Sequence, residues 1–99
     1  MMDRNEILER LRQNADAIRG MGATSLFLFG SSARDEATGE SDIDLFIDYD
    51  RTQRFSLIDL VRIKQLLEEQ MSAEVDITTR DGLHPMLRKD IERSAVRVF

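Results

Sequence analysis

The sequence predicts an α/β (α+β) fold in which a mixed sheet, with both parallel and antiparallel strands, packs against helices. Two apolar runs, residues 26–29 and 43–47, follow one another closely, and a third, alternating segment covers residues 74–78. Apolar segments of this length are typical of strands. Apolar residues also recur at helical spacing before residue 19, between residues 57 and 71, and after residue 85. We therefore expect one domain, residues 1–99, with the order α-β-α-β-α-β-α.

The lengths of the connections predict the directions of the strands. The link after Gly30 is short for a parallel crossover, which needs a helix and its loops, so the first two strands should be antiparallel. The long helical segment before the third strand leaves room for a right-handed parallel crossover. We therefore expect the sheet order 1-2-3, with helices on one face and the other face partly open.

Capping residues predict where the helices begin and end. Asp3 is placed to cap the first helix, and the glycines within residues 20–22 end it. Ser56 is placed to cap a long helix that runs to about residue 70. Pro85 fits the first turn of a last helix that ends near residue 94. The predicted inner face of that helix consists of Met86, Leu87 and Ile91.

Three polar or terminal segments have a less specific pattern. Residues 79–82 predict a loop, and Asp48, at the end of the second strand, is expected on the surface. The apolar, alternating tail at residues 95–99 is either a strand that docks on a partner or a strand added to its own sheet.

Two aspartates lie near the start of the second predicted strand. Side chains alternate along a strand, so Asp42 and Asp44 share one face, with Cα atoms about 7 Å apart. Carboxylates this close repel one another unless a cation lies between them, and oxygen ligands without His or Cys suit Mg²⁺ or Mn²⁺. Asp76, near the same end of the third strand, is the candidate third carboxylate. The alternative is that the pair forms the solvated face of an edge strand, although Asp is disfavoured in strands.

A Gly-Ser pair ends the first strand, and antiparallel pairing places it beside these aspartates. Gly30 allows a phosphate to approach the backbone closely. We expect Ser31 to cap a short helix whose free N–H groups favour an anion. A metal site beside a phosphate-binding segment is the arrangement required for phosphoryl transfer.

This pattern resembles the active site of the polymerase β-type nucleotidyltransferase superfamily: a Gly-Ser pair, a ten-residue gap, an Asp-x-Asp and a later Asp. It is most similar to the smallest branch, the minimal nucleotidyltransferases (MNT, MntA-like). The likeness extends over nearly the whole chain and includes residues 55–61, the Glu-Val-Asp strand and the Arg-Lys-Asp-Ile segment near the end. Ser32 and Asp35 depart from the basic or aromatic residue and the Ala-Arg-Gly usual in the family, which would weaken nucleotide binding.

The resemblance implies a Mg²⁺-dependent enzyme that transfers AMP from ATP to a protein hydroxyl. The acceptor would be a tyrosine of a HEPN-domain RNase toxin, and this chain would be the antitoxin of a type VII-like toxin–antitoxin pair. The implied catalytic residues, which also bind two Mg²⁺ ions, are Asp42, Asp44 and Asp76. The implied nucleotide-binding residues are Gly30, Ser31 and Arg34, although Arg34 could equally be a solvated helix residue.

Two other functions are consistent with the sequence. The chain could be a non-catalytic binding module that neutralises its partner sterically. Transfer to a small molecule such as an aminoglycoside is less expected, because such enzymes usually bind the acceptor with a second domain.

Composition argues against several other kinds of function. The net charge of −5 disfavours direct nucleic-acid binding and suits a basic protein partner. The absence of cysteine excludes disulfides and thiolate chemistry. The sequence shows no signal peptide and no long apolar run, so we expect a cytoplasmic protein without membrane contact.

Overall fold

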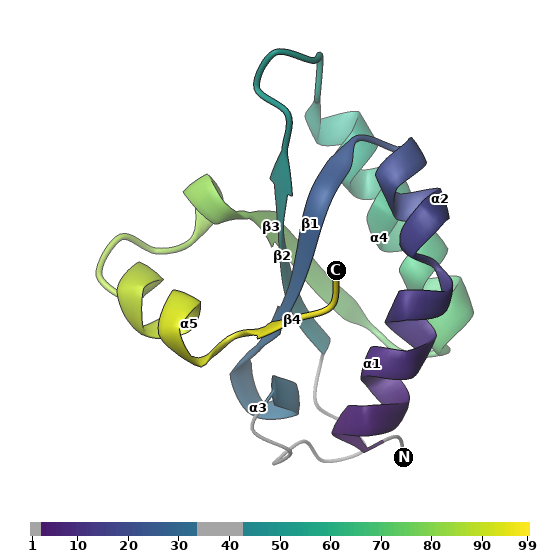
Figure 1. Ribbon diagram of the computed structural model, residues 1–99, viewed down its shortest axis with the longest axis vertical. Helices are drawn as coiled ribbons and strands as arrows, with labels where there is room; N and C mark the ends of the chain where they lie inside the picture. The colour runs from purple at the N-terminus through teal and green to yellow at the C-terminus, as the bar shows by residue number, and fades with distance from the viewer. Residues whose placement is uncertain (1–2, 34–42) are drawn as a thin grey trace.

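A computed structural model of the protein describes residues 3–33 and 43–99, apart from the side chains of residues 31 and 32. Within these residues the chain forms a four-stranded mixed sheet in the order β3-β2-β1-β4 (Figure 1). β1 (Ala23–Phe29) is antiparallel to β2 (Ile43–Tyr49), and β2 is parallel to β3 (Val75–Thr79). Both strand directions were predicted from the lengths of the connections.

The predicted order 1-2-3 omitted a strand. β4 (Val96–Arg97) pairs antiparallel with the other edge of β1. The pairing continues beyond β4, because the Val98 N–H donates to the Leu26 carbonyl and the Leu26 N–H donates to the Phe99 carbonyl. The apolar tail therefore adds to its own sheet, and the order is corrected to β3-β2-β1-β4.

Three helices cover one face of the sheet: α1 (Arg4–Gln13), α2 (Ala15–Gly20) and α4 (Leu57–Met71) (Figure 1). The predicted single first helix is interrupted at Asn14, which leaves the helical conformation and whose side-chain amide donates to the Arg10 carbonyl. Ser56 caps α4 as predicted, in a reciprocal capping box with Asp59. The core between these helices and the sheet includes Leu11, Ile18, Leu26, Leu28, Leu45, Ile47, Ile63, Leu67 and Met71.

The expectation that helices cover only one face was wrong. Residues 80–82, predicted as a loop, form a 3-10 turn, η1 (Arg80–Gly82), and the chain then leads into α5 (Arg88–Ser94). Figure 1 shows η1 and α5 on the side of the sheet away from α1, α2 and α4. Ion pairs, described below, hold them there.

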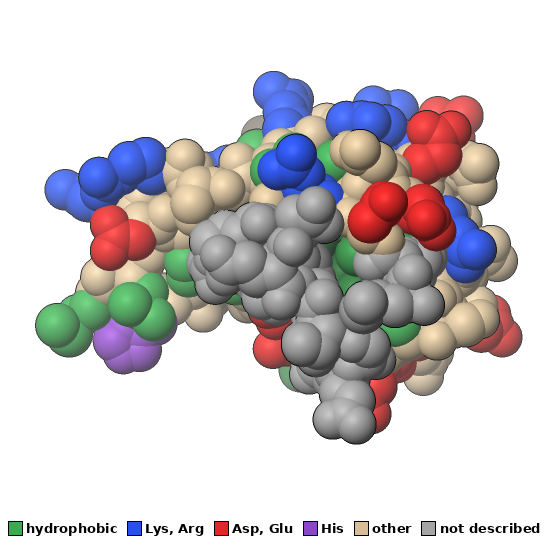
Figure 2. Space-filling view, turned by 90° about the horizontal axis from the view of Figure 1, so that it is seen from below, with side chains coloured by type: hydrophobic (Ala, Val, Ile, Leu, Met, Phe, Trp, Pro, Cys, Tyr) green, Lys and Arg blue, Asp and Glu red, His purple; other side chains and the backbone are tan. Residues whose placement is uncertain are grey.

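The predicted inner face of the last helix was also wrong. α5 begins three residues after Pro85, and Met86 and Leu87 lie in the preceding turn, where they are 84% and 53% exposed. Figure 2 shows hydrophobic side chains gathered beside the single histidine at this end of the molecule. Only Ile91 of the predicted face is partly buried. No helix within the described ranges is long and apolar enough to span a bilayer.

Candidate active site

Two of the predicted carboxylates are neighbours on the sheet. Asp44 and Asp76 are Cα partners in the parallel β2–β3 ladder, where adjacent strands lie about 4.8 Å apart. Leu45 and Val75 point into the core beneath the helices, so the two aspartates point to the opposite face. Asp44 is half-buried and Asp76 is exposed. The prediction that these two carboxylates share a face is confirmed.

The end of β1 contacts the same carboxylate pair. Phe29 is the Cα partner of Asp44, and the next residue, Gly30, turns the chain with a φ of +73°. A Cβ atom built on Gly30 would lie 2.5 Å from Oδ2 of Asp44. The missing side chain therefore allows the Gly30 backbone and the Asp44 carboxylate to approach one another closely.

The short helix α3 (Gly30–Ala33) starts at this glycine. Ser31 is therefore in the first turn and does not precede the helix as its cap, which corrects the expectation from sequence. The Arg4 guanidinium donates to the Ala33 carbonyl at 3.3 Å and ties the end of α3 to the start of α1. Asp42 and Arg34 lie outside the described residues.

The residues present suit a hard cation. Within residues 3–33 and 43–99 no cluster of three or more potential metal ligands is found, and Asp42, the first aspartate of the predicted Asp-x-Asp pair, is outside these ranges. The two carboxylates that the structure does bring together offer only oxygen donors from rigid, adjacent strands. This donor set fits Mg²⁺, which binds proteins through one or two carboxylates and otherwise through phosphates and water.

Replacing Gly30 by alanine is expected to weaken Mg²⁺-ATP binding at least tenfold. The Cβ would displace the Asp44 carboxylate. Alanine would also have to adopt the positive φ of this position, which should lower the free energy of unfolding by about 1–2 kcal/mol. Isothermal titration calorimetry and urea unfolding measure the two effects. Gly20→Ala is the matched control, because a Cβ there meets nothing within 4 Å. Unchanged ATP affinity in Gly30→Ala would rule out this role of the glycine.

An aromatic cluster lies beside the carboxylates on the same face. Phe46, two residues after Asp44, is fully buried although it faces away from α4. Phe27 stacks on it with ring centroids 4.7 Å apart, and Phe29 packs at 5.8 Å. The Arg80 guanidinium lies 5.0 Å from the centroids of both Phe27 and Phe46, a cation–π arrangement that covers the cluster.

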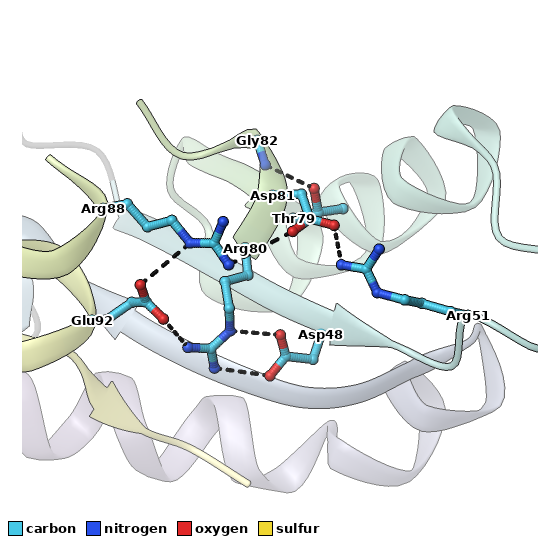
Figure 3. Close-up of polar contacts among 8 residues, drawn as sticks. All are labelled: Asp48, Arg51, Thr79, Arg80, Asp81, Gly82, Arg88 and Glu92. Atoms are coloured by element: carbon cyan, nitrogen blue, oxygen red, sulfur yellow. Dashed lines mark hydrogen bonds and ion pairs between the residues drawn. The ribbon is translucent and has the colours of Figure 1, made fainter. Parts of the chain in front are cut away.

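Arg80 is also the centre of an ion-pair network (Figure 3). Its Nε and Nη2 donate to both carboxylate oxygens of Asp48, at 2.8 and 2.9 Å, and its Nη1 donates to Glu92 of α5 at 2.5 Å. The hydrogen bonds to Asp48 raise the pKa of Arg80 above its ordinary value, as does the single hydrogen bond to Glu92, although burial opposes this. Arg88 extends the network to Glu92 and Asp81.

Asp48 is therefore not the surface residue predicted from sequence. It is half-buried and paired, and it keeps the strand phase of Asp44. One signal in the sequence could have indicated its partner: in a parallel pair that aligns Asp44 with Asp76, the residue level with Asp48 is Arg80.

The sequence matches the family model described as the nucleotidyltransferase domain over residues 4–98. The chain belongs to the nucleotidyltransferase family. A relative of this nucleotidyltransferase from Methanocaldococcus jannaschii, provisionally named protein adenylyltransferase MJ0435, is 42% identical over 78 residues, which cover 79% of this chain and 82% of the relative.

Solved structures agree with this assignment. A structure provisionally described as a minimal nucleotidyltransferase is 36% identical to this chain and superposes with a TM-score of 0.74. The match covers 96% of this chain and 95% of the chain in that structure. A crystal structure described as a toxin–antitoxin with AMP-PNP has a TM-score of 0.68, and the match covers 99% of this chain and 73% of the chain in that structure. At 19% identity the second shows the fold alone. The nucleotidyltransferase is thus an enzyme of the minimal type.

Proposed function

We propose that this nucleotidyltransferase transfers AMP from ATP to a hydroxyl group of a partner protein and thereby acts as the antitoxin of a toxin–antitoxin pair. The observation that carries the proposal is the contact between the Gly30 backbone and the Asp44 carboxylate, with Asp76 directly across the sheet. A relative named as a protein adenylyltransferase and a structure named as a toxin–antitoxin with AMP-PNP support it. A tyrosine of a HEPN-domain RNase is the acceptor that the family resemblance favours.

The proposed roles of Asp44, Asp76 and Gly30 follow their positions, and those of Asp42 and Arg34 follow the family resemblance. Asp44 and Asp76, together with Asp42, would hold Mg²⁺, which when bound neutralises phosphate charge and lowers the pKa of an attacking hydroxyl. The Gly30 backbone, which carries no side chain and closely approaches the Asp44 carboxylate, would let the triphosphate come near the chain beside Asp44. Arg34 is the further candidate for contact with the triphosphate, and Ser31 lies in the same turn as Gly30.

Asp76 is exposed and lies on the β3 side of Asp44, away from Gly30, where an incoming hydroxyl has access. Its carboxylate would take the proton of that hydroxyl. A bond forms between the hydroxyl oxygen and the α-phosphorus. The bond from the α-phosphorus to the bridging oxygen breaks, and pyrophosphate leaves with its electron pair. Because the register between β2 and β3 is fixed, the main contribution of these strands to the rate would be to hold the hydroxyl in line with the α-phosphorus.

The test is intact mass spectrometry of the partner that co-purifies with the chain, before and after Mg²⁺-ATP is added. Wild type is expected to add one or more AMP masses to the partner, and Asp42→Asn/Asp44→Asn is expected to add none while it still folds and binds. If both proteins neutralise the partner and neither changes its mass, the chain is a steric binding module. The exposed apolar side chains of Leu57 and Ile58 on α4 would give such a module a contact surface.

A further inference from the structure

Arg97 lies on the same face of the sheet as the carboxylates. It is the Cα partner of Phe27 in the antiparallel β1–β4 pair, and Phe27 is in turn the partner of Phe46 on β2. Directly opposed residues point to the same face. Arg97, Phe27 and Phe46 therefore form one row across three strands, and the row of Phe29, Asp44 and Asp76 lies two residues further along.

The Arg97 guanidinium is available to a ligand. The side chain is exposed, and its guanidinium rests 5.9 Å from the centroid of the Phe27 ring. It forms no ion pair with any residue that the structure describes. Three other arginines on this side of the sheet differ, since each is paired with a carboxylate: Arg80, Arg88 and Arg93. An aromatic ring holds Arg97 in place without neutralising its charge.

Charge changes sign across the strands of the site. β3 and β2 carry Asp76 and Asp44, β1 ends at the bare backbone of Gly30, and β4 carries Arg97. From strand spacing and rise, the Cα atom of Arg97 lies about 12 Å from that of Asp44. An arginine side chain and a triphosphate together span this gap. Arg97 lies on the Gly30 side of Asp44, opposite to Asp76 and the side open to the acceptor.

We propose that Arg97 binds the β- and γ-phosphates of the nucleoside triphosphate. The inference rests on the proposed function, because it requires the α-phosphate to lie beside Gly30 and the two carboxylates. The guanidinium fork matches two phosphate oxygens. Its contact distinguishes a triphosphate from a monophosphate, which ends before it reaches β4.

The test is the affinity of the full chain for Mg²⁺-ATP and for AMP, measured by calorimetry. Arg97→Ala is expected to raise the Kd for ATP about tenfold or more, since hydrogen bonds to charged groups contribute about 1.5–3 kcal/mol, and to leave the Kd for AMP nearly unchanged. Arg97→Lys should restore part of the ATP affinity. Arg93→Ala, which removes another exposed arginine, on α5, is the control and should bind both nucleotides as wild type does.

Two results would overturn the inference alone, and a third would overturn the proposed function as well. ATP affinity within twofold of wild type in Arg97→Ala overturns the inference and leaves the proposed function intact. Equal losses for ATP and AMP place Arg97 at the nucleoside or α-phosphate and also overturn it. If wild type binds no Mg²⁺-ATP while it remains folded by circular dichroism, the proposed function fails and the inference fails with it.

Discussion

Asp44→Asn should lower the rate of AMP transfer by at least about 10³-fold, which corresponds to about 4 kcal/mol of transition-state stabilisation. Asp44 is central to the site, because its carboxylate lies close to Gly30 on one side and Asp76 is its neighbour on β3 on the other. Asparagine has nearly the same volume but lacks the charge needed to hold Mg²⁺. The variant should therefore fold and lose the chemistry.

Initial rates of labelled AMP incorporation into the partner measure this effect, with thermal unfolding followed on the same samples. Asp16→Asn removes a negative charge from a fully exposed site on α2 and is the matched control. It should transfer AMP at the wild-type rate. An Asp44→Asn variant that kept more than a tenth of the wild-type rate would be incompatible with a metal-binding role for this carboxylate.

Arg80→Met is expected to lower the free energy of unfolding by about 2–3 kcal/mol. The side chains of Arg80, Asp48 and Glu92 are 27%, 33% and 30% exposed, so the substitution takes the partly buried Asp48 carboxylate from its arginine partner and leaves Glu92 paired with Arg88 alone. Removing one partner of a fully buried pair costs about 3–5 kcal/mol, and solvent reduces that cost here. The variant also removes the guanidinium that covers Phe46.

Urea unfolding measures the change, and for a domain of this size the melting temperature should fall by about 10–20 °C. Arg93→Met breaks an ion pair whose side chains are 77% and 75% exposed and should change stability by less than about 0.5 kcal/mol. A double-mutant cycle with Asp48→Asn should give a coupling of about 1–3 kcal/mol. Additive effects would show that Arg80 acts through Phe46 and Glu92 and not through Asp48.

Local sequence pattern predicted the elements that are long and regular. Ile43, Leu45 and Ile47 alternate with polar or aromatic residues, and this period of two placed Asp44 on the face opposite the core. The short first connection and the long second one then predicted both strand pairings. These features depend on neighbours in sequence, which is why they could be predicted from the chain alone.

Features that depend on distant partners could not be predicted in this way. Arg80 and Asp48 are 32 residues apart, and their pairing can be inferred only after the register between β2 and β3 has been fixed. Pro85 favours a helix start, but the chain makes another turn first, so two apolar side chains thought to be buried are exposed. β4 has two residues, too few for a periodic pattern.

The alternation along β2 also has a consequence for folding. A shift of β2 by one residue against its neighbours would turn Asp44 and Asp48 into the core under α4 and move Leu45 and Ile47 out of that core to the face of the carboxylates. Burying an unpaired carboxylate costs several kcal/mol, so a sheet with this error is much less stable than the native one. The side chains proposed to act on ATP therefore also specify how the sheet assembles, and a correctly paired sheet is one whose carboxylates already face the substrate.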